Sequence, residues 1–124
     1  MQYNPIGWFE IPVSDLDRAT KFYEHVLEIS MKRQDIPGWK TSWFPSDDNA
    51  KGISGVLMQG DGYHPGSTGP VMYFTCTDID AAVKRAQEIG VHIMFGKKDI
   101  GEWGYIAWLY DTEGNIMALH TRKN

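Results

Sequence analysis

The chain has 124 residues, of which 42% are hydrophobic and 23% charged, and its formal net charge at pH 7 is −4. This length suits one globular domain with its own core, and an acidic chain without a basic run gives a nucleic-acid role no electrostatic support. Cys76 is the single cysteine, so no internal disulfide forms. No apolar run approaches the roughly 20 residues that a membrane span needs. We therefore expect a cytoplasmic protein with neither a nucleic-acid nor a membrane partner.

The first half of the chain predicts a strand, a helix and three further strands. The run IGWFEIPV (6–13) is the first strand, with Pro12 near its end, where a proline is tolerated. Ser14, followed three residues later by Asp17, resembles a capping box that opens a helix. The helix is predicted from apolar residues at helical spacing, namely Leu16, Ala19, Tyr23, Val26 and Leu27. Three shorter strand candidates follow: ISMKRQ (29–34), KTSWF (40–44) and GISGVLMQ (52–59).

The second half repeats this order after a loop. The segment GDGYHPGSTGP (60–70) is rich in glycine and proline and predicts a linker. VMYFTC (71–76) is the next strand, Thr77 and Asp80 repeat the helix cap, and Gly90 suits the position after the helix. The remaining strand candidates are VHIMF (91–95), GYIAWLY (104–110) and NIMALH (115–120).

The two halves share a short sequence frame. When Asp15 is placed over Asp78, both helices begin with D-[LI]-D-x-A-x-K. Each half therefore corresponds to a β-α-β-β-β unit. One unit alone leaves a mostly open sheet, whereas two units can share a core or curve around a common cavity. We predict an α+β fold in which two βαβββ units, at about 1–60 and 69–124, form a cupped mixed or antiparallel sheet around a cavity, within a single domain of residues 1–124.

This pattern resembles the glyoxalase/bleomycin-resistance/dioxygenase group, the vicinal oxygen chelate superfamily. The resemblance is carried by IPVSDLDRATKFYEHVL, FTCTDIDAAVKRAQEIG and LYDTEGNIMALH, in that order, and covers nearly the whole chain. It implies a cavity inside the cupped sheet. In the metal-dependent members of the group, His and Glu side chains from four strands hold a divalent metal there, and the metal chelates two neighbouring oxygens of the substrate.

The metal-ligand positions of the group are filled by other residue types in this chain. Counting from the helix-cap aspartates and the turn glycine places Trp8, Val71 and Ala118 at three of them. The fourth falls within GISGVLM, which contains no His, Asp or Glu. Apart from a serine hydroxyl, none of these side chains suits Zn²⁺, Ni²⁺, Mn²⁺ or Fe²⁺. We therefore expect no cofactor, with a divalent metal at a non-standard site as the alternative.

Strand alternation extends the set of predicted cavity residues, because side chains two apart on a strand share a face. Glu10 would then face the cavity with Trp8, and His120 with Ala118. Glu10 and His120 are the candidate catalytic residues: a mid-strand glutamate in an apolar run acts as a general base or orients a ligand if burial raises its pKa, and His120 transfers a proton. Alternatively, Glu10 is an exposed or paired strand residue and His120 an exposed strand end.

Seven further residues are predicted to bind the ligand, because the chain has five tryptophans and an aromatic cavity suits flat or apolar ligands. On the seventh strand two registers stay open, with either Tyr105 or Trp108 pointing inward. Trp103, between two glycines, either closes over the ligand or packs on the sheet. The predicted ligand-binding residues are Trp8, Trp43, Tyr73, Thr75, Trp103, Tyr105 and Trp108.

Three functions compete at this level. The first is a metal-free protein that binds a small molecule in an aromatic cavity. The second is an enzyme of the same superfamily, lactoylglutathione lyase-like or dioxygenase-like, that uses Glu10 and His120 or a non-standard metal site. The third, an ordinary metal-dependent lactoylglutathione lyase, is disfavoured by the missing ligands. The partner implied by the resemblance is a second copy of the chain in a homodimer.

Overall fold

The fold consists of two βαβββ modules, and the computed structural model describes residues 2–123 of it. Module 1 contains β1 (Phe9–Pro12), α1 (Leu16–Leu27), β2 (Lys32–Arg33), β3 (Lys40–Trp43) and β4 (Gly55–Gln59). Module 2 contains β5 (Met72–Thr75), α2 (Ile79–Ile89), β6 (Ile93–Asp99), the short 3-10 helix η1 (Gly101–Trp103), β7 (Tyr105–Tyr110) and β8 (Ile116–Thr121). The predicted element order and the α+β class are confirmed.

Both helices begin one residue later than the predicted caps. Asp15, not Ser14, is the N-cap of α1, and its carboxylate accepts a hydrogen bond from the Arg18 backbone N–H at 3.1 Å. Asp78 caps α2 in the same way, with the Ala81 N–H at 3.0 Å. Aspartate is among the strongest N-cap residues because its oxygen satisfies a free N–H of the first turn. The repeated aspartate therefore starts both helices.

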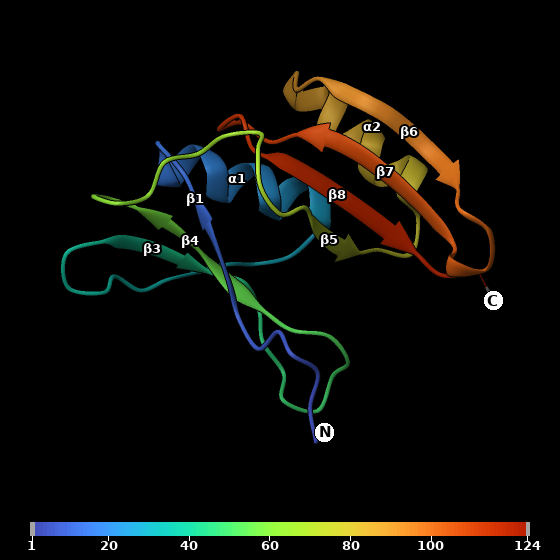
Figure 1. Cartoon of the computed structure of the whole chain (residues 1–124). Coiled ribbons are helices and arrows are strands. Elements are labelled where there is room, and N and C mark those ends of the chain that lie inside the picture. The colour runs from blue at the N-terminus through green and yellow to red at the C-terminus, as the bar shows by residue number, and fades with distance from the viewer. Residues whose placement is uncertain (1, 124) are drawn as a thin grey trace.

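The strands form two separate four-stranded sheets, which Figure 1 shows as two distinct layers of arrows. Sheet 1 has the order β1-β4-β3-β2 and sheet 2 the order β5-β8-β7-β6. In each sheet the first two strands pair in parallel and the others antiparallel, so both sheets are mixed as predicted. That both sheets together surround a cavity stays a prediction.

One hydrophobic core joins the two modules. Helices α1 and α2 pack against each other, and each sheet turns one face towards them. Three rings from the two modules contact one another: Tyr23 of α1 and Phe44 beside sheet 1, which belong to the core, and the partly buried Phe74 of β5, with centroids 5.4 to 5.6 Å apart. The opposite faces of the two sheets are not part of this core. The two modules thus share one core on the helix side, and the opposite face of each sheet lies outside it.

The turn from Asp111 to Asn115 ties module 2 to module 1. The buried Asp111 carboxylate accepts a 2.7 Å hydrogen bond from the Tyr23 hydroxyl. Asn115 Nδ2 donates to the Pro12 carbonyl at 2.8 Å, and its Oδ1 accepts from the Gly66 N–H in the linker. The turn therefore holds β1, helix α1 and the linker in a fixed arrangement.

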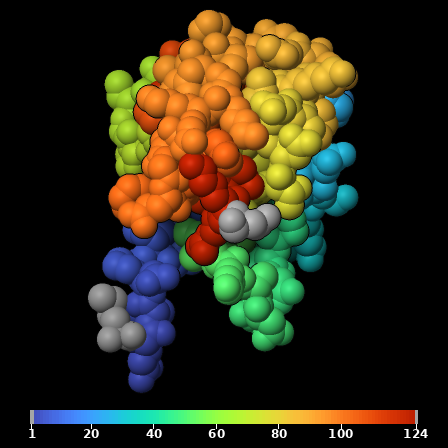
Figure 2. Space-filling view, turned by 90° about the vertical axis from the view of Figure 1, so that its right-hand side faces the viewer, coloured from blue at the N-terminus to red at the C-terminus, as the bar shows by residue number. Residues whose placement is uncertain are grey.

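Two segments project from the body of the molecule. Figure 2 shows the N-terminal residues and the segment between β3 and β4 as separate protrusions. Tyr3 and Ile6 on the first protrusion and Ile53 on the second are exposed apolar residues, at 79%, 62% and 48%. Within residues 2–123, no helix has the length and apolar character to cross a membrane.

Candidate ligand-binding site

The open face of sheet 1 carries a tryptophan pair above a small apolar floor. The register places Glu10 beside Val56, and Val56 beside Trp43, so these three side chains share a face. Trp8, directly before β1, lies with its ring centroid 5.1 Å from that of Trp43. Val56 is fully buried although it is outside the shared core. The rings therefore cover this part of the sheet, and Trp8 remains 44% exposed.

Glu10 is exposed and is held by a residue of the linker. The Tyr63 hydroxyl donates to Glu10 Oε1 at 2.7 Å. The Tyr63 ring in turn packs edge-on against Trp39, with centroids 6.0 Å apart. The sequence left two alternatives open for Glu10, a buried general base or an exposed or paired strand residue. The structure has the second, an exposed carboxylate paired with the Tyr63 hydroxyl.

The open face of sheet 2 is built from a second set of rings. Tyr73 lies beside Ala118, and Ala118 beside Trp108, across three adjacent strands. The Trp108 indole Nε1–H donates to the Tyr73 hydroxyl at 2.9 Å, and the Trp108 ring stacks on Phe95 at 5.6 Å. Tyr73 is 46% exposed. Ala118, at a metal-ligand position of the resembled group, forms the floor between these rings.

His120 lies at the end of the same face. It pairs with Thr75 of β5 and with Ile106 of β7, and its Nε2 lies 2.6 Å from the Trp103 carbonyl oxygen. Trp103 itself, in η1, is 68% exposed. The structure thus brings the predicted residues Thr75, His120 and Trp103 together at one end of the strands of sheet 2.

Tyr105 is the predicted site residue that the structure separates from the others. It packs against the shared core on the helix side of β7, in line with Ala107 and Leu109. Lys97 and Lys123 both place their ammonium groups over its ring, at 4.5 and 5.0 Å from the centroid. Of the two registers left open by the sequence, the structure has the one in which Trp108 faces the open side.

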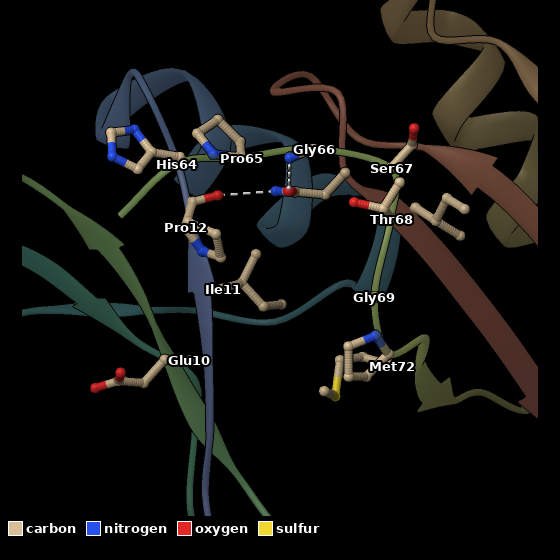
Figure 3. Close-up of a pocket in the computed structure, with 13 residues that line it drawn as sticks. Glu10, Ile11, Pro12, His64, Pro65, Gly66, Ser67, Thr68, Gly69 and Met72 are labelled. Atoms are coloured by element: carbon tan, nitrogen blue, oxygen red, sulfur yellow. Dashed lines mark hydrogen bonds between the residues drawn. The ribbon is translucent and has the colours of Figure 1, made fainter. Parts of the chain in front are cut away.

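A cavity of about 370 Å³ lies between β1 and the linker. Figure 3 shows His64, Pro65 and Gly66 across one end of it, and Glu10 and Met72 towards the other. A second cavity, of about 420 Å³, is lined by Tyr73 and Thr75 together with apolar residues of both modules. Glu10 on one side and Tyr73 on the other therefore each border an open hollow.

The described residues do not fit a resident metal ion. Among residues 2–123, no three His, Cys, Asp or Glu side chains converge closely enough to hold one. Trp8 and Ala118, at two ligand positions of the resembled group, supply no donor atom suited to a divalent cation. Glu10 and His120 belong to different sheets.

Two residues of these faces escaped the sequence interpretation: Tyr63 and Phe95. Tyr63 lies in the linker, where no strand alternation indicates which way a side chain points. The register of β6 is shifted twice along β7, so alternation could not assign Phe95 to a face either. Only the composition of five tryptophans and six tyrosines signalled an aromatic surface of this size.

Comparison with known proteins settles the family. Residues 5–119 match the model of the Glyoxalase/Bleomycin resistance protein/Dioxygenase superfamily. The chain belongs to this superfamily. The resemblance found in the repeated helix starts and in the final segment LYDTEGNIMALH is thereby confirmed, and so is the doubled module.

Three relatives show how widely the superfamily fold is used. The antibiotic-binding protein TnmS3 from Streptomyces sp. CB03234 is 26% identical, with a TM-score of 0.70 and 99% of both chains covered. The fosfomycin resistance protein FosX from Listeria monocytogenes shares the fold at 18% identity, with a TM-score of 0.70, 98% of this chain and 96% of FosX covered. CFP32 of Mycobacterium tuberculosis, named as a glyoxylase, is 23% identical over 115 residues. That match covers 91% of this chain but 44% of CFP32, so the chain spans less than half the length of that relative.

Proposed function

We propose that this protein binds a small, flat organic molecule on its aromatic sheet faces, without the catalytic metal of its enzymatic relatives. The observation that carries the proposal is that each sheet leaves an aromatic face uncovered while its other face belongs to the core. Trp8 and Tyr73 expose 44% and 46% of their surface on these faces, and Trp103 in η1 exposes 68%. Exposed rings gathered beside a hollow are typical of sites for ligands with ring systems. The likeness to TnmS3, an antibiotic-binding protein, supports binding as the function.

We propose further that a second copy of the chain completes the site. The sheet 1 face presents Trp8 and Trp43, and the sheet 2 face presents Tyr73 and Trp108. The two faces are therefore similar in their aromatic surface, which packing of two copies would bury. Two copies that place the sheet 1 face of one chain against the sheet 2 face of the other would enclose two equivalent cavities. A homodimer is the closed symmetric assembly that such self-complementary surfaces form.

The enzymatic alternative requires Glu10 and His120 to act on one substrate. A lyase-like or dioxygenase-like reaction has the superfamily in its favour. Within one chain, however, the two residues lie on different sheets, and the His120 Nε2 is engaged with the Trp103 carbonyl. Binding without turnover needs neither residue to move, so we favour it.

The first experiment measures ligand binding and assembly together. We expect calorimetric titration with acridine, a neutral three-ring molecule, to show one site per chain, and sedimentation equilibrium to show a dimer. Trp8→Ala and Tyr73→Ala should each weaken binding about tenfold, because each removes one ring wall. Ile89→Ala is the control: Ile89 is 40% exposed on α2, on the helix side, and its loss should leave affinity unchanged. Acridine affinity untouched by both ring variants would overturn the proposal.

The second experiment tests the metal. Chelator-treated protein is unfolded thermally with and without Ni²⁺, Zn²⁺, Mn²⁺ and Fe²⁺. A metal present at 100 times its Kd would add about 2.7 kcal/mol to the free energy of unfolding. We expect no such shift. A clear rise in Tm that Glu10→Gln or His120→Ala removes would instead favour the enzymatic alternative.

A further inference from the structure

We propose that the Glu10 end of the site binds a positively charged nitrogen, so that the ligand class is a flat aromatic molecule that carries a protonated amine or guanidine group. This inference rests on the proposed function, because it assigns a chemical class to the ligand of the same site. It follows from three features of the sheet 1 face. The Glu10 carboxylate has no cationic partner among the described residues, aromatic rings lie beside it, and the lysine on the same face is far from it.

The Glu10 carboxylate has no cationic partner within residues 2–123. The ion pairs of the described chain join other carboxylates, among them Glu113 with Arg18 and Asp99 with Lys123. Glu10 instead accepts one neutral hydrogen bond, from Tyr63, to its Oε1. That bond fixes the position of the carboxylate and leaves the charge, and the second oxygen, available to a ligand.

Aromatic rings stand beside this carboxylate. Trp8 lies two residues before Glu10, the Tyr63 ring carries the hydroxyl that Glu10 binds, and Trp43 packs against Trp8 on the same face. Ring faces attract organic cations, tryptophan most strongly, and a nearby carboxylate adds a full opposite charge. A neutral aromatic ligand would use the rings alone, whereas a cationic one would use both.

The lysine of this face does not neutralise Glu10. The register places Lys32 on the same side as Trp43, but in β2, the outer edge strand. Strand order separates Lys32 from Glu10 by three strand spacings, or about 14 Å. At that separation an exposed lysine is largely screened at physiological ionic strength. The potential next to Glu10 is therefore negative, which favours a cation and disfavours an anion.

The test compares three probes with the same ring system: 9-aminoacridine, which is a cation, neutral acridine, and anionic acridine-9-carboxylate. At about pH 8 we expect wild-type protein to bind 9-aminoacridine about tenfold more tightly than acridine, and the carboxylate least. Glu10→Gln should bring the affinities for 9-aminoacridine and acridine together while acridine affinity stays unchanged. Glu88→Gln, which removes one exposed charge from α2, should preserve the wild-type preference.

The salt dependence of wild-type binding gives a readout that needs no variant. Added NaCl should weaken binding of 9-aminoacridine and leave acridine unaffected, because only the charged pair is screened. If none of the three probes binds, the proposed function itself fails. If they bind with equal affinity, or the carboxylate binds best, the cation inference is overturned while the aromatic site stands.

Discussion

Glu113 of module 2 holds Arg18 of module 1 in a two-point ion pair. Arg18 Nε lies 2.8 Å from Glu113 Oε2, and Arg18 Nη2 lies 3.0 Å from Oε1. The same carboxylate accepts hydrogen bonds from the backbone N–H groups of Ser14 and Asp15, at 3.0 and 2.8 Å. Its side chain is fully covered, whereas the Arg18 side chain is 52% exposed. Glu113 therefore accepts hydrogen bonds from free N–H groups at the start of helix α1, although it lies 98 residues after Asp15 in the sequence.

We expect Glu113→Gln to lower the free energy of unfolding by about 2 kcal/mol, because a neutral amide cannot satisfy this donor set. Urea unfolding followed by far-ultraviolet circular dichroism measures the change. Asp17→Asn is the control, since the Asp17 carboxylate pairs with Arg33 at the surface and is 80% exposed. Equal losses in the two variants would contradict a special role of Glu113.

The Glu113 ion pair also predicts a pH dependence. Burial alone would raise the pKa of Glu113, but hydrogen bonds from Arg18, from the Thr112 hydroxyl and from two backbone amides lower it to about 2. A carboxyl whose pKa is lower in the folded protein contributes stability above its unfolded value, near 4.5. That contribution is lost as the pH falls towards 2. The stability difference between wild type and Glu113→Gln should therefore shrink steadily over that window in urea titrations, and a constant difference would contradict the assignment.

Tyr23→Phe isolates one hydrogen bond in the shared core. The variant keeps the ring contacts with Phe44 and Phe74 and loses the bond to Asp111. Burial raises the pKa of Tyr23 well above its usual value, so this hydroxyl stays protonated and donates. We expect a loss of about 1–2 kcal/mol in urea unfolding. Tyr63→Phe, which removes the exposed bond to Glu10, should leave stability nearly unchanged.

Ser42→Ala is expected to keep or raise stability. The Ser42 hydroxyl oxygen is buried and has no hydrogen-bond partner among the described residues. The substitution removes a buried hydroxyl that forms no hydrogen bond, so we expect it to raise the free energy of unfolding by about 1 kcal/mol. Thr41→Val, at the next position, is the matched contrast: Thr41 bonds to the Gln34 carbonyl and accepts from Trp43 Nε1, so its loss should destabilise. Opposite signs in thermal unfolding would confirm the distinction.

Gly104→Ala tests the turn that positions Trp103 next to His120. Gly104 has a φ of +106°, and an added Cβ would run into the Thr121 carbonyl oxygen. Gly114 also has a positive φ, +87°, but its Cβ would meet nothing. Gly114→Ala should therefore cost about 1 kcal/mol from the backbone alone, and Gly104→Ala distinctly more. If the two variants have the same Tm, the close approach is not limiting.

The sequence predicted the local elements well because their signals are local. The apolar stripe from Leu16 to Leu27 sets α1, and Gly90, with a φ of +98°, ends α2 as expected. Even the helix caps were missed by one residue only. These features depend on neighbours within a few positions, which the chain displays directly.

The solvent exposure of side chains on the strands could not be predicted in the same way. The pattern around Glu10 correctly indicated a strand. The residues next to Glu10 in space are Val56 on the neighbouring strand and Tyr63 in the linker, and both are far away in sequence. Whether a strand face is covered depends on how the two modules pack, and that packing puts the helix side inside. For this reason the sequence could not decide between a buried and an exposed Glu10.

The distribution of aromatic residue types has a practical consequence for spectroscopy. The rings at the centre of the core belong to phenylalanine and tyrosine, and the core cluster of the described residues includes no tryptophan. The five indoles stand on the open faces, at the linker and in η1. Intrinsic tryptophan emission of this protein thus reports the environment of its outer faces rather than the packing of its core. An unfolding curve followed by tryptophan emission will record further solvent exposure of a surface that is already partly exposed in the folded protein.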